Sequence, residues 1–197
     1  LYISHLICKG HGYPFWYPEP DSSGSAVYAE QGVQPGDVGI LSDIGGFNYL
    51  FNIYRDADHA VNIGGVPPGF QPLHSKHSTS QQIIGNCYGH NITSANVDCT
   101  EISAGASFEF RTTKDSAAIL CLPNSATKYE NLNKRAIKDY ATANGAAWYN
   151  YVNSSEYLGR EAPNGSLYVV TGCDKTDSWG TAAVGKPSQS REVSISF

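Results

Sequence analysis

The sequence lacks any stretch of about 18 consecutive apolar residues, so it predicts no membrane-spanning helix. Charged side chains are also scarce, at 16% of the chain against about 25% in average globular proteins. The net charge is −5, which is the wrong sign for a broad phosphate-binding face. We therefore expect no binding to nucleic acid.

Motifs of the familiar enzyme classes are absent as well. The sequence contains no G-x-S-x-G elbow, no phosphate-cradling loop and no Gly-rich dinucleotide fingerprint. His74 and His77, with Asp56, Asp58 and His59 nearby, could hold a metal, but they lack the His-Glu-x-x-His order and Lys76 stands among them. A solvated loop is the favoured interpretation, so we expect neither a metal nor a cofactor.

Cysteine usage also argues against a disulfide framework or a zinc site, because the number is odd and no CxxC spacing occurs. The five cysteines are Cys8, Cys87, Cys99, Cys121 and Cys173. Reduced, mostly buried thiols in an intracellular protein are favoured. Three glycosylation sequons, which begin at Asn91, Asn153 and Asn164, keep a secreted protein with a Cys87–Cys99 bridge open as the alternative.

What the sequence does contain in quantity is Gly, Pro and Tyr, with 20, 10 and 13 residues, and this composition favours strands and turns. Residues 36–43 and 47–54 are two β-rich runs joined by Gly45-Gly46, which predicts a hairpin. In its second arm the alternation of Phe47, Tyr49, Phe51 and Ile53 predicts one core-facing side.

Further strands are predicted after a long polar segment. Residues 56–82 are punctuated by Gly and Pro and read as a surface loop. Signals for strands follow at residues 82–84, 92–97, 107–111, 117–122, 166–171, 181–184 and 193–197. The run at 107–111 alternates between polar and apolar residues. The run at 117–122 is continuously apolar, which is typical of a buried strand.

One segment changes to a helical period. The apolar stripe consists of Leu132, Ala136, Tyr140, Ala147, Trp148, Tyr151 and Val152. Thr127 and Glu130 have capping-box spacing, which predicts a helix start near Lys128. Gly145 lies inside this helix and predicts a kink or break there.

Together these signals predict an α+β fold, in which one long helix, continuous or kinked, packs on a mainly antiparallel sheet or sandwich. We expect residues 1–197 to form a single domain. The last residues alternate like a strand that stops without a turn, so we also expect the chain to be a processed or trimmed piece of a longer protein.

Near the start, residues 10–20 combine three prolines with four aromatic side chains, which excludes a helix. If Tyr13, Phe15, Trp16 and Tyr17 are exposed, they form an apolar patch of the kind that marks a partner surface. If they are buried, the segment is a strap over the core. The strap is the favoured interpretation.

Several motifs occur in a fixed order along the chain. They are GHGYPFWYPEP at 10–20, GDVGI at 36–40, the run 47–53, WYNYVN at 148–153 and GSLYVVTGCDKTDSWG at 165–180. In these the chain resembles a large family of uncharacterised proteins from basidiomycete fungi. The resemblance omits residues 69–104, implies a fungal source and members that extend further, and carries over no catalytic residue.

The last of these motifs holds the candidate site, because Asp174, Lys175, Asp177 and Trp179 share one turn between two strands. Two carboxylates, a lysine and an indole could bind a polar ligand such as a sugar, by hydrogen bonds and by stacking. The alternative is an Asp/Ser-rich turn with Trp179 folded back onto the sheet.

These observations favour a non-catalytic recognition module of a fungal protein, which binds a protein or glycan partner. The first alternative is a hydrolase or nuclease that uses Asp174, Asp177, Glu161 and the loop histidines. Glu161 also belongs to a charged cluster with Glu156 and Arg160, for which a solvated helix end is the favoured interpretation. The second alternative is a defence protein that inserts amphipathic hairpins into membranes.

Overall fold

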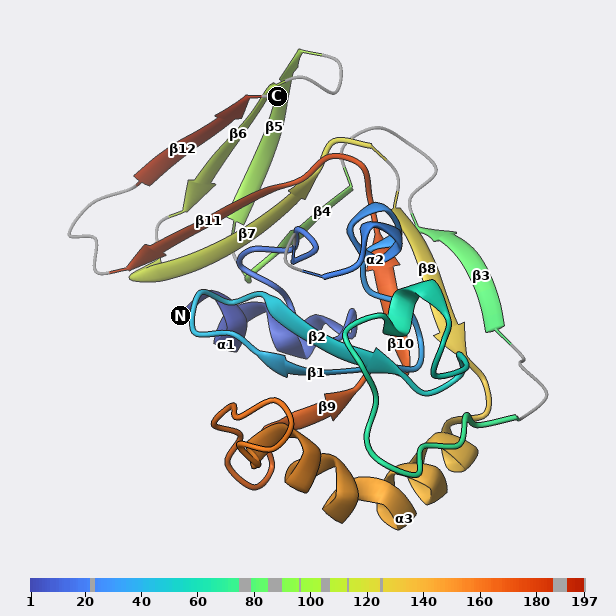
Figure 1. Cartoon of the computed structure of the whole chain (residues 1–197). Helices are drawn as coiled ribbons and strands as arrows, with labels where there is room; N and C mark the ends of the chain where they lie inside the picture. The colour runs from blue at the N-terminus through green and yellow to red at the C-terminus, as the bar shows by residue number, and fades with distance from the viewer. Residues whose placement is uncertain are drawn as a thin grey trace. The chain divides into compact units, whose positions relative to one another are not determined.

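The computed structural model describes residues 1–21, 24–74, 79–84, 90–95, 97–103, 107–112, 114–124, 126–185 and 191–196 (Figure 1). The predicted α+β class is confirmed, because the described strands form several antiparallel pairs and are accompanied by one long helix. No helix among these residues is both long and apolar enough to cross a bilayer. The chain divides into two compact units, which are described separately below, and the predicted single domain stays a prediction.

Unit 1 comprises residues 1–16, 81–128 and 174–197. It begins with the helix α1 (Tyr2–Leu6) and the short 3₁₀ helix η1 (Ile7–Lys9), neither of which the sequence predicted. Two antiparallel sheets follow. One has the order β11–β7–β4, and the other has the order β12–β6–β5. Their strands are β4 (His90–Thr93), β5 (Val97–Ser103), β6 (Ser107–Thr112), β7 (Ser116–Leu122), β11 (Gly180–Gly185) and β12 (Arg191–Ser196).

The strands β6 and β7 supply most of the interior of unit 1. On β6 the alternation predicted from the sequence is confirmed, because Phe108 and Phe110 are both 1% exposed. On β7 the continuous apolar run is buried on both faces, as predicted. One face packs with Ile92, Tyr2 and Leu6, and the other packs with the phenyl rings of β6.

Unit 2 comprises residues 17–80 and 129–173. Its sheet has the order β2–β1–β9, with β1 (Asp37–Leu41), β2 (Phe47–Asn52) and β9 (Leu167–Val169). The predicted hairpin is confirmed by the antiparallel pairing of β1 with β2. The unit also contains α2 (Ala26–Gln31), the 3₁₀ helix η2 (Ala60–Asn62) and the long helix α3 (Lys134–Asn153).

The core of unit 2 lies between this sheet and α3 (Figure 1). Phe51 is fully buried, and its ring meets those of Trp148 and Tyr151 edge to face. Phe47, Phe51 and Ile53 of the predicted core-facing side are buried, but the alternation is interrupted because the register with β1 shifts at Leu50. This bulge turns Leu50 and Phe51 into the same core, whereas Tyr49 is only half-buried and stacks on Tyr28.

The predicted start of the long helix is wrong. Residues 126–131 form the strand β8 (Ala126–Asn131), and α3 begins at Lys134 after Asn133, whose side-chain oxygen accepts from the Ala136 amide. Leu132 is therefore outside the helix and 60% exposed. Of the predicted kink or break at Gly145, the break is wrong, because α3 continues as one helix through this residue.

Three strands contain points at which the chain passes from one unit to the other. They are β3 (Thr79–Ile84), β8 and β10 (Gly172–Lys175), and they form a sheet in the order β10–β8–β3. The predicted loop at 56–82 therefore ends earlier than expected, because its last residues belong to β3. Residues 75–78 lie outside the described residues.

The favoured strap interpretation of the opening aromatic segment is wrong. Tyr13, Trp16 and Tyr17 are 37%, 41% and 46% exposed. Within unit 1, Trp16 is held through its ring edge against Tyr2 and through its carbonyl oxygen, which accepts from Thr181 Oγ1. These contacts hold Trp16 in place while part of its ring remains accessible.

Candidate functional site

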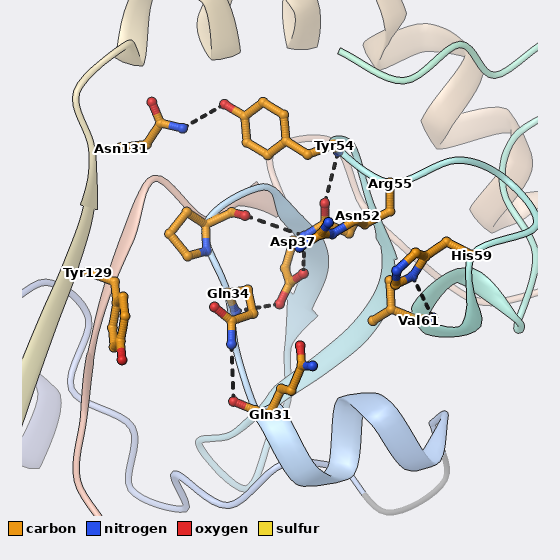
Figure 2. A pocket seen from close by; sticks show the side chains of 11 residues that line it. Gln31, Gln34, Asp37, Asn52, Tyr54, Arg55, His59, Val61, Tyr129 and Asn131 are labelled. Atoms are coloured by element: carbon orange, nitrogen blue, oxygen red, sulfur yellow. Dashed lines mark hydrogen bonds between the residues drawn. The ribbon is translucent and has the colours of Figure 1, made fainter. Parts of the chain in front are cut away.

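Unit 2 contains a pocket of about 380 Å³, to which separate parts of the chain contribute (Figure 2). α2 and the turn after it lie along one side, the end of β2 and the loop to η2 lie along another, and β8 faces them across the pocket. The lining residues are Gln31, Gln34, Pro35, Asp37, Asn52, Tyr54, Arg55, His59, Val61, Tyr129 and Asn131. We call this the unit 2 pocket.

The carboxylate of Asp37 is the buried acidic group of this pocket. Asp37 is 1% exposed, and its two oxygens accept separate hydrogen bonds at 2.7 Å, one from the Gln34 amide and one from Asn52 Nδ2. Asn52 in turn accepts from the Tyr54 amide and donates to the Pro35 carbonyl. A carboxylate oxygen accepts hydrogen bonds and can accept more than one, so a hydroxyl is the kind of ligand group that suits it.

Asn62 holds the loop that forms one side of the pocket. It is 1% exposed, and its Nδ2 donates to the carbonyl oxygens of Asn52, Arg55 and Asp56 at 3.0–3.2 Å. Its Oδ1 accepts from the Asn52 amide and from the Tyr49 hydroxyl. One side chain thus satisfies backbone groups that would otherwise be buried without partners. The loop geometry depends on it.

A glycine allows Tyr54 to form the pocket wall. Gly36 has φ +93°, and a Cβ atom at this position would overlap the Tyr54 ring. The Tyr54 hydroxyl accepts from Asn131 Nδ2 at 2.8 Å, which ties the end of β2 to β8. The first residue of the GDVGI motif therefore has a structural reason to be glycine, and the second residue is the buried acid.

Arg55 and His59 are the basic side chains of the pocket, and both are exposed. His59 Nδ1 accepts from the Val61 amide at 3.1 Å, so the proton of the neutral ring is assigned to Nε2. Neither the Arg55 guanidinium nor His59 Nε2 has a hydrogen bond or ion pair with the described residues. Both remain available as donors.

The charge of Asp37 affects other groups of unit 2. The pKa values of Tyr28 and Tyr49 are both raised. Burial is the largest cause, and the negative charge of Asp37 is the second. These two phenol groups therefore stay protonated throughout the physiological pH range.

The predicted site residues all lie at or just after β10, at the edge of unit 1. Asp174 Oδ2 is 2.9 Å from His11 Nδ1, and Asp177 Oδ1 accepts from Asn124 Nδ2 at 2.8 Å. Lys175 is half-buried on β10. Trp179 is half-buried and packs against the cluster around Tyr2 and Leu6, which accords with the alternative of an indole folded onto its sheet.

The other candidate groups belong to different parts of the chain. Among the described residues no three His, Cys, Asp or Glu side chains are placed to share a metal ion, and His77 lies outside these residues. His59 alone of the proposed ligands lines the unit 2 pocket. Glu161, which the hydrolase interpretation grouped with Asp174 and Asp177, belongs to unit 2 and is exposed, whereas the two aspartates belong to unit 1.

The three sequons differ in the burial and hydrogen bonding of their asparagine side chains. Asn91 is half-buried on β4 and donates to Cys99 Sγ, and Asn153 makes three side-chain hydrogen bonds at the end of α3. Asn164 is exposed in a turn that closes between Pro163 and Ser166. Cys8, Cys99, Cys121 and Cys173 form no disulfide with one another, and Cys87 lies outside the described residues.

The sequence contains part of the signal for this site. Asp37 belongs to the GDVGI motif, and Asn52 and Tyr54 belong to the second arm of the predicted hairpin, but these positions alone indicate structure and not a site. Asn62 and Asn131 carried no signal, because a polar side chain in a loop or at a strand end gives no sign of its burial. No protein-family model, curated protein or solved structure matches this chain.

Proposed function

We propose that this protein is a non-catalytic recognition module and that the unit 2 pocket binds a sugar residue of a glycan. The observation that carries the proposal is the lining of the pocket, which combines a buried carboxylate with four carboxamide side chains and two tyrosines. The carboxamides are Gln31, Gln34, Asn52 and Asn131, and the tyrosines are Tyr54 and Tyr129.

Such a set suits a ligand that is rich in hydroxyl groups. Each hydroxyl both donates and accepts, carboxylates accept, and carboxamides do both. A tyrosine ring offers an apolar face for the C–H side of a sugar and a hydroxyl for its polar edge. The volume of about 380 Å³ lies within the range of small-molecule sites, which are about 300–1,000 Å³.

Pre-organisation supports binding here. Asp37 and Asn52 are fixed by hydrogen bonds before any ligand arrives, and Tyr54 is fixed by Asn131. Groups that are already ordered lose little further conformational entropy when they bind, so their hydrogen bonds contribute more fully to affinity.

The test is a glycan array probed with the full chain, followed by calorimetric titration of the glycans that are retained. Asp37→Asn is expected to weaken binding by about tenfold or more, because it removes a charge-assisted acceptor. Tyr129→Leu keeps an apolar side chain but removes the ring, and it is expected to weaken binding without changing the circular dichroism spectrum.

Matched controls exist within the same unit. Asp139→Asn changes an exposed carboxylate on α3 that faces Arg135, and Tyr168→Leu changes a tyrosine that is 44% exposed on β9. Both are expected to bind like the unsubstituted protein. If no glycan is retained, or if the pocket variants bind as well as these controls, the proposal is wrong.

A second candidate function rests on the pairing of His11 with Asp174 in unit 1. An aspartate that bonds one ring nitrogen orients the imidazole so that its other nitrogen can transfer a proton, as hydrolases require. This candidate predicts slow turnover of chromogenic ester or phosphodiester substrates, which His11→Gln abolishes. Turnover that is absent, or that survives in His11→Gln, contradicts it.

A further inference from the structure

The rim of the unit 2 pocket carries two nitrogen donors that its own residues leave unused, and this inference about them rests on the proposed function. The Arg55 guanidinium makes no ion pair or hydrogen bond with the described residues. His59 directs Nδ1 to the Val61 amide, which leaves Nε2–H as a donor. Both side chains are exposed members of the lining (Figure 2).

We propose that the bound sugar is a hexuronic acid, whose carboxylate is held by Arg55 and His59 at the rim. A guanidinium presents two parallel N–H groups that match the two oxygens of a carboxylate, and such charge-assisted pairs are among the stronger hydrogen bonds of proteins. The hydroxyls on the rest of the ring then bond to Asp37 and to the carboxamides.

The position of Asp37 fixes the orientation of this ligand. A buried carboxylate repels a second carboxylate but accepts hydrogen bonds from hydroxyls, so the acidic end of the sugar is excluded from the Asp37 side of the pocket. The rim offers donors and the buried side offers an acceptor. The hydroxyls of a neutral hexose can bond on both sides, but only a uronate adds a charge-assisted pair at the rim.

The charge balance favours a carboxylate over a phosphate. The pocket contains one arginine against the carboxylate of Asp37, and Asp56 and Asp58 follow Arg55 along the chain. A phosphomonoester carries a charge of about −1.5 to −2 at neutral pH, whereas a uronate carries −1. A single arginine in acidic surroundings matches the smaller charge.

The experiment compares methyl glucuronide with methyl glucoside, and methyl galacturonide with methyl galactoside, by calorimetric titration of the full chain. At least one uronide is expected to bind about tenfold more tightly than its neutral partner, because it adds a charge-assisted pair. Methyl glucoside 6-phosphate is the third arm and is expected to bind more weakly than the uronide. The preference should shrink as salt is added.

Two arginine variants distinguish the effect of Arg55 at the rim from the general effect of removing one positive charge. Arg55→Gln is expected to abolish the preference for the uronide over its neutral partner, because the charge-assisted pair is lost. Arg135→Gln removes an exposed arginine of α3, which lies 3.7 Å from Asp139, and is expected to alter neither ligand.

The outcomes distinguish this inference from the proposed function. If uronide and glycoside bind equally, if Arg55→Gln retains the preference, or if the phosphate binds most tightly, the uronate inference is overturned. The proposed function still stands in those cases, provided that Asp37→Asn weakens the binding. If no sugar of either kind binds, the proposed function fails and this inference fails with it.

Discussion

Asn62 is the residue whose removal tests the structural account of the pocket most directly. In Asn62→Ala, three backbone carbonyls, one backbone amide and the Tyr49 hydroxyl lose a partner at a site that is 1% exposed. A hydrogen bond contributes about 0.5–1.5 kcal/mol net, and a buried group left without a partner costs about 1–3 kcal/mol. Some of these groups will find new partners, so we expect a loss of about 3–5 kcal/mol in the free energy of unfolding.

The measurement is urea denaturation followed by far-UV circular dichroism and tryptophan fluorescence. Asn144→Ala is the matched control, because Asn144 lies in the same unit and its side chain makes one hydrogen bond along α3, to the Tyr140 carbonyl. Its stability is expected to change by less than about 1 kcal/mol, since alanine favours the helix. A loss for Asn62→Ala that is no larger than the loss for this control would refute the reasoning.

Three further predictions concern other parts of the chain. Gly145→Ala should raise the free energy of unfolding by about 0.5–1 kcal/mol in thermal melts, because α3 is continuous there and a Cβ would meet no atom within 4 Å. Cys121, with a pKa that burial raises to about 12, should resist alkylation at pH 8 while the exposed Cys8 reacts. The native state should also lose stability above about pH 9, where only the unfolded thiol ionises. In a secreting host Asn164 should carry a glycan that an endoglycosidase removes, and peptide mass spectrometry should find the other two sequons unmodified.

Where an apolar pattern is long and regular, the sequence predicted the structure well. The hairpin of β1 and β2 followed from two β-rich runs and a Gly-Gly turn, and β6 and β7 followed from alternation and from a buried run. Each of these signals is local, so the rest of the chain did not need to be known to interpret it.

The prediction failed where a local pattern was overruled by pairing with distant residues. Thr127 and Glu130 have capping-box spacing, yet they lie in β8, and the helix begins only after Asn133. The segments α1 and α2 were missed because a helix of five or six residues is too short to establish a period.

The candidate site was missed for a related reason. Aspartate and asparagine occur mostly in exposed turns, so the sequence does not distinguish Asp37 and Asn62 from ordinary surface residues. Their significance comes from burial and from partners that the fold supplies, and neither can be read from residue type alone. Asp174, Asp177 and Trp179 are predicted as site residues only because several side chains that can bind a polar ligand occur close together in one turn.

The interleaving of the two units along the chain has a consequence for synthesis on the ribosome. The polypeptide passes between the units four times, at 16/17, 80/81, 128/129 and 173/174. Phe51 is synthesised long before Trp148 and Tyr151, whose rings pack against it. The first half of unit 2 therefore keeps its apolar face uncovered while residues 81–128 are made. For the same reason no contiguous fragment holds either unit, and their separate contributions have to be dissected by substitution rather than by cutting the chain.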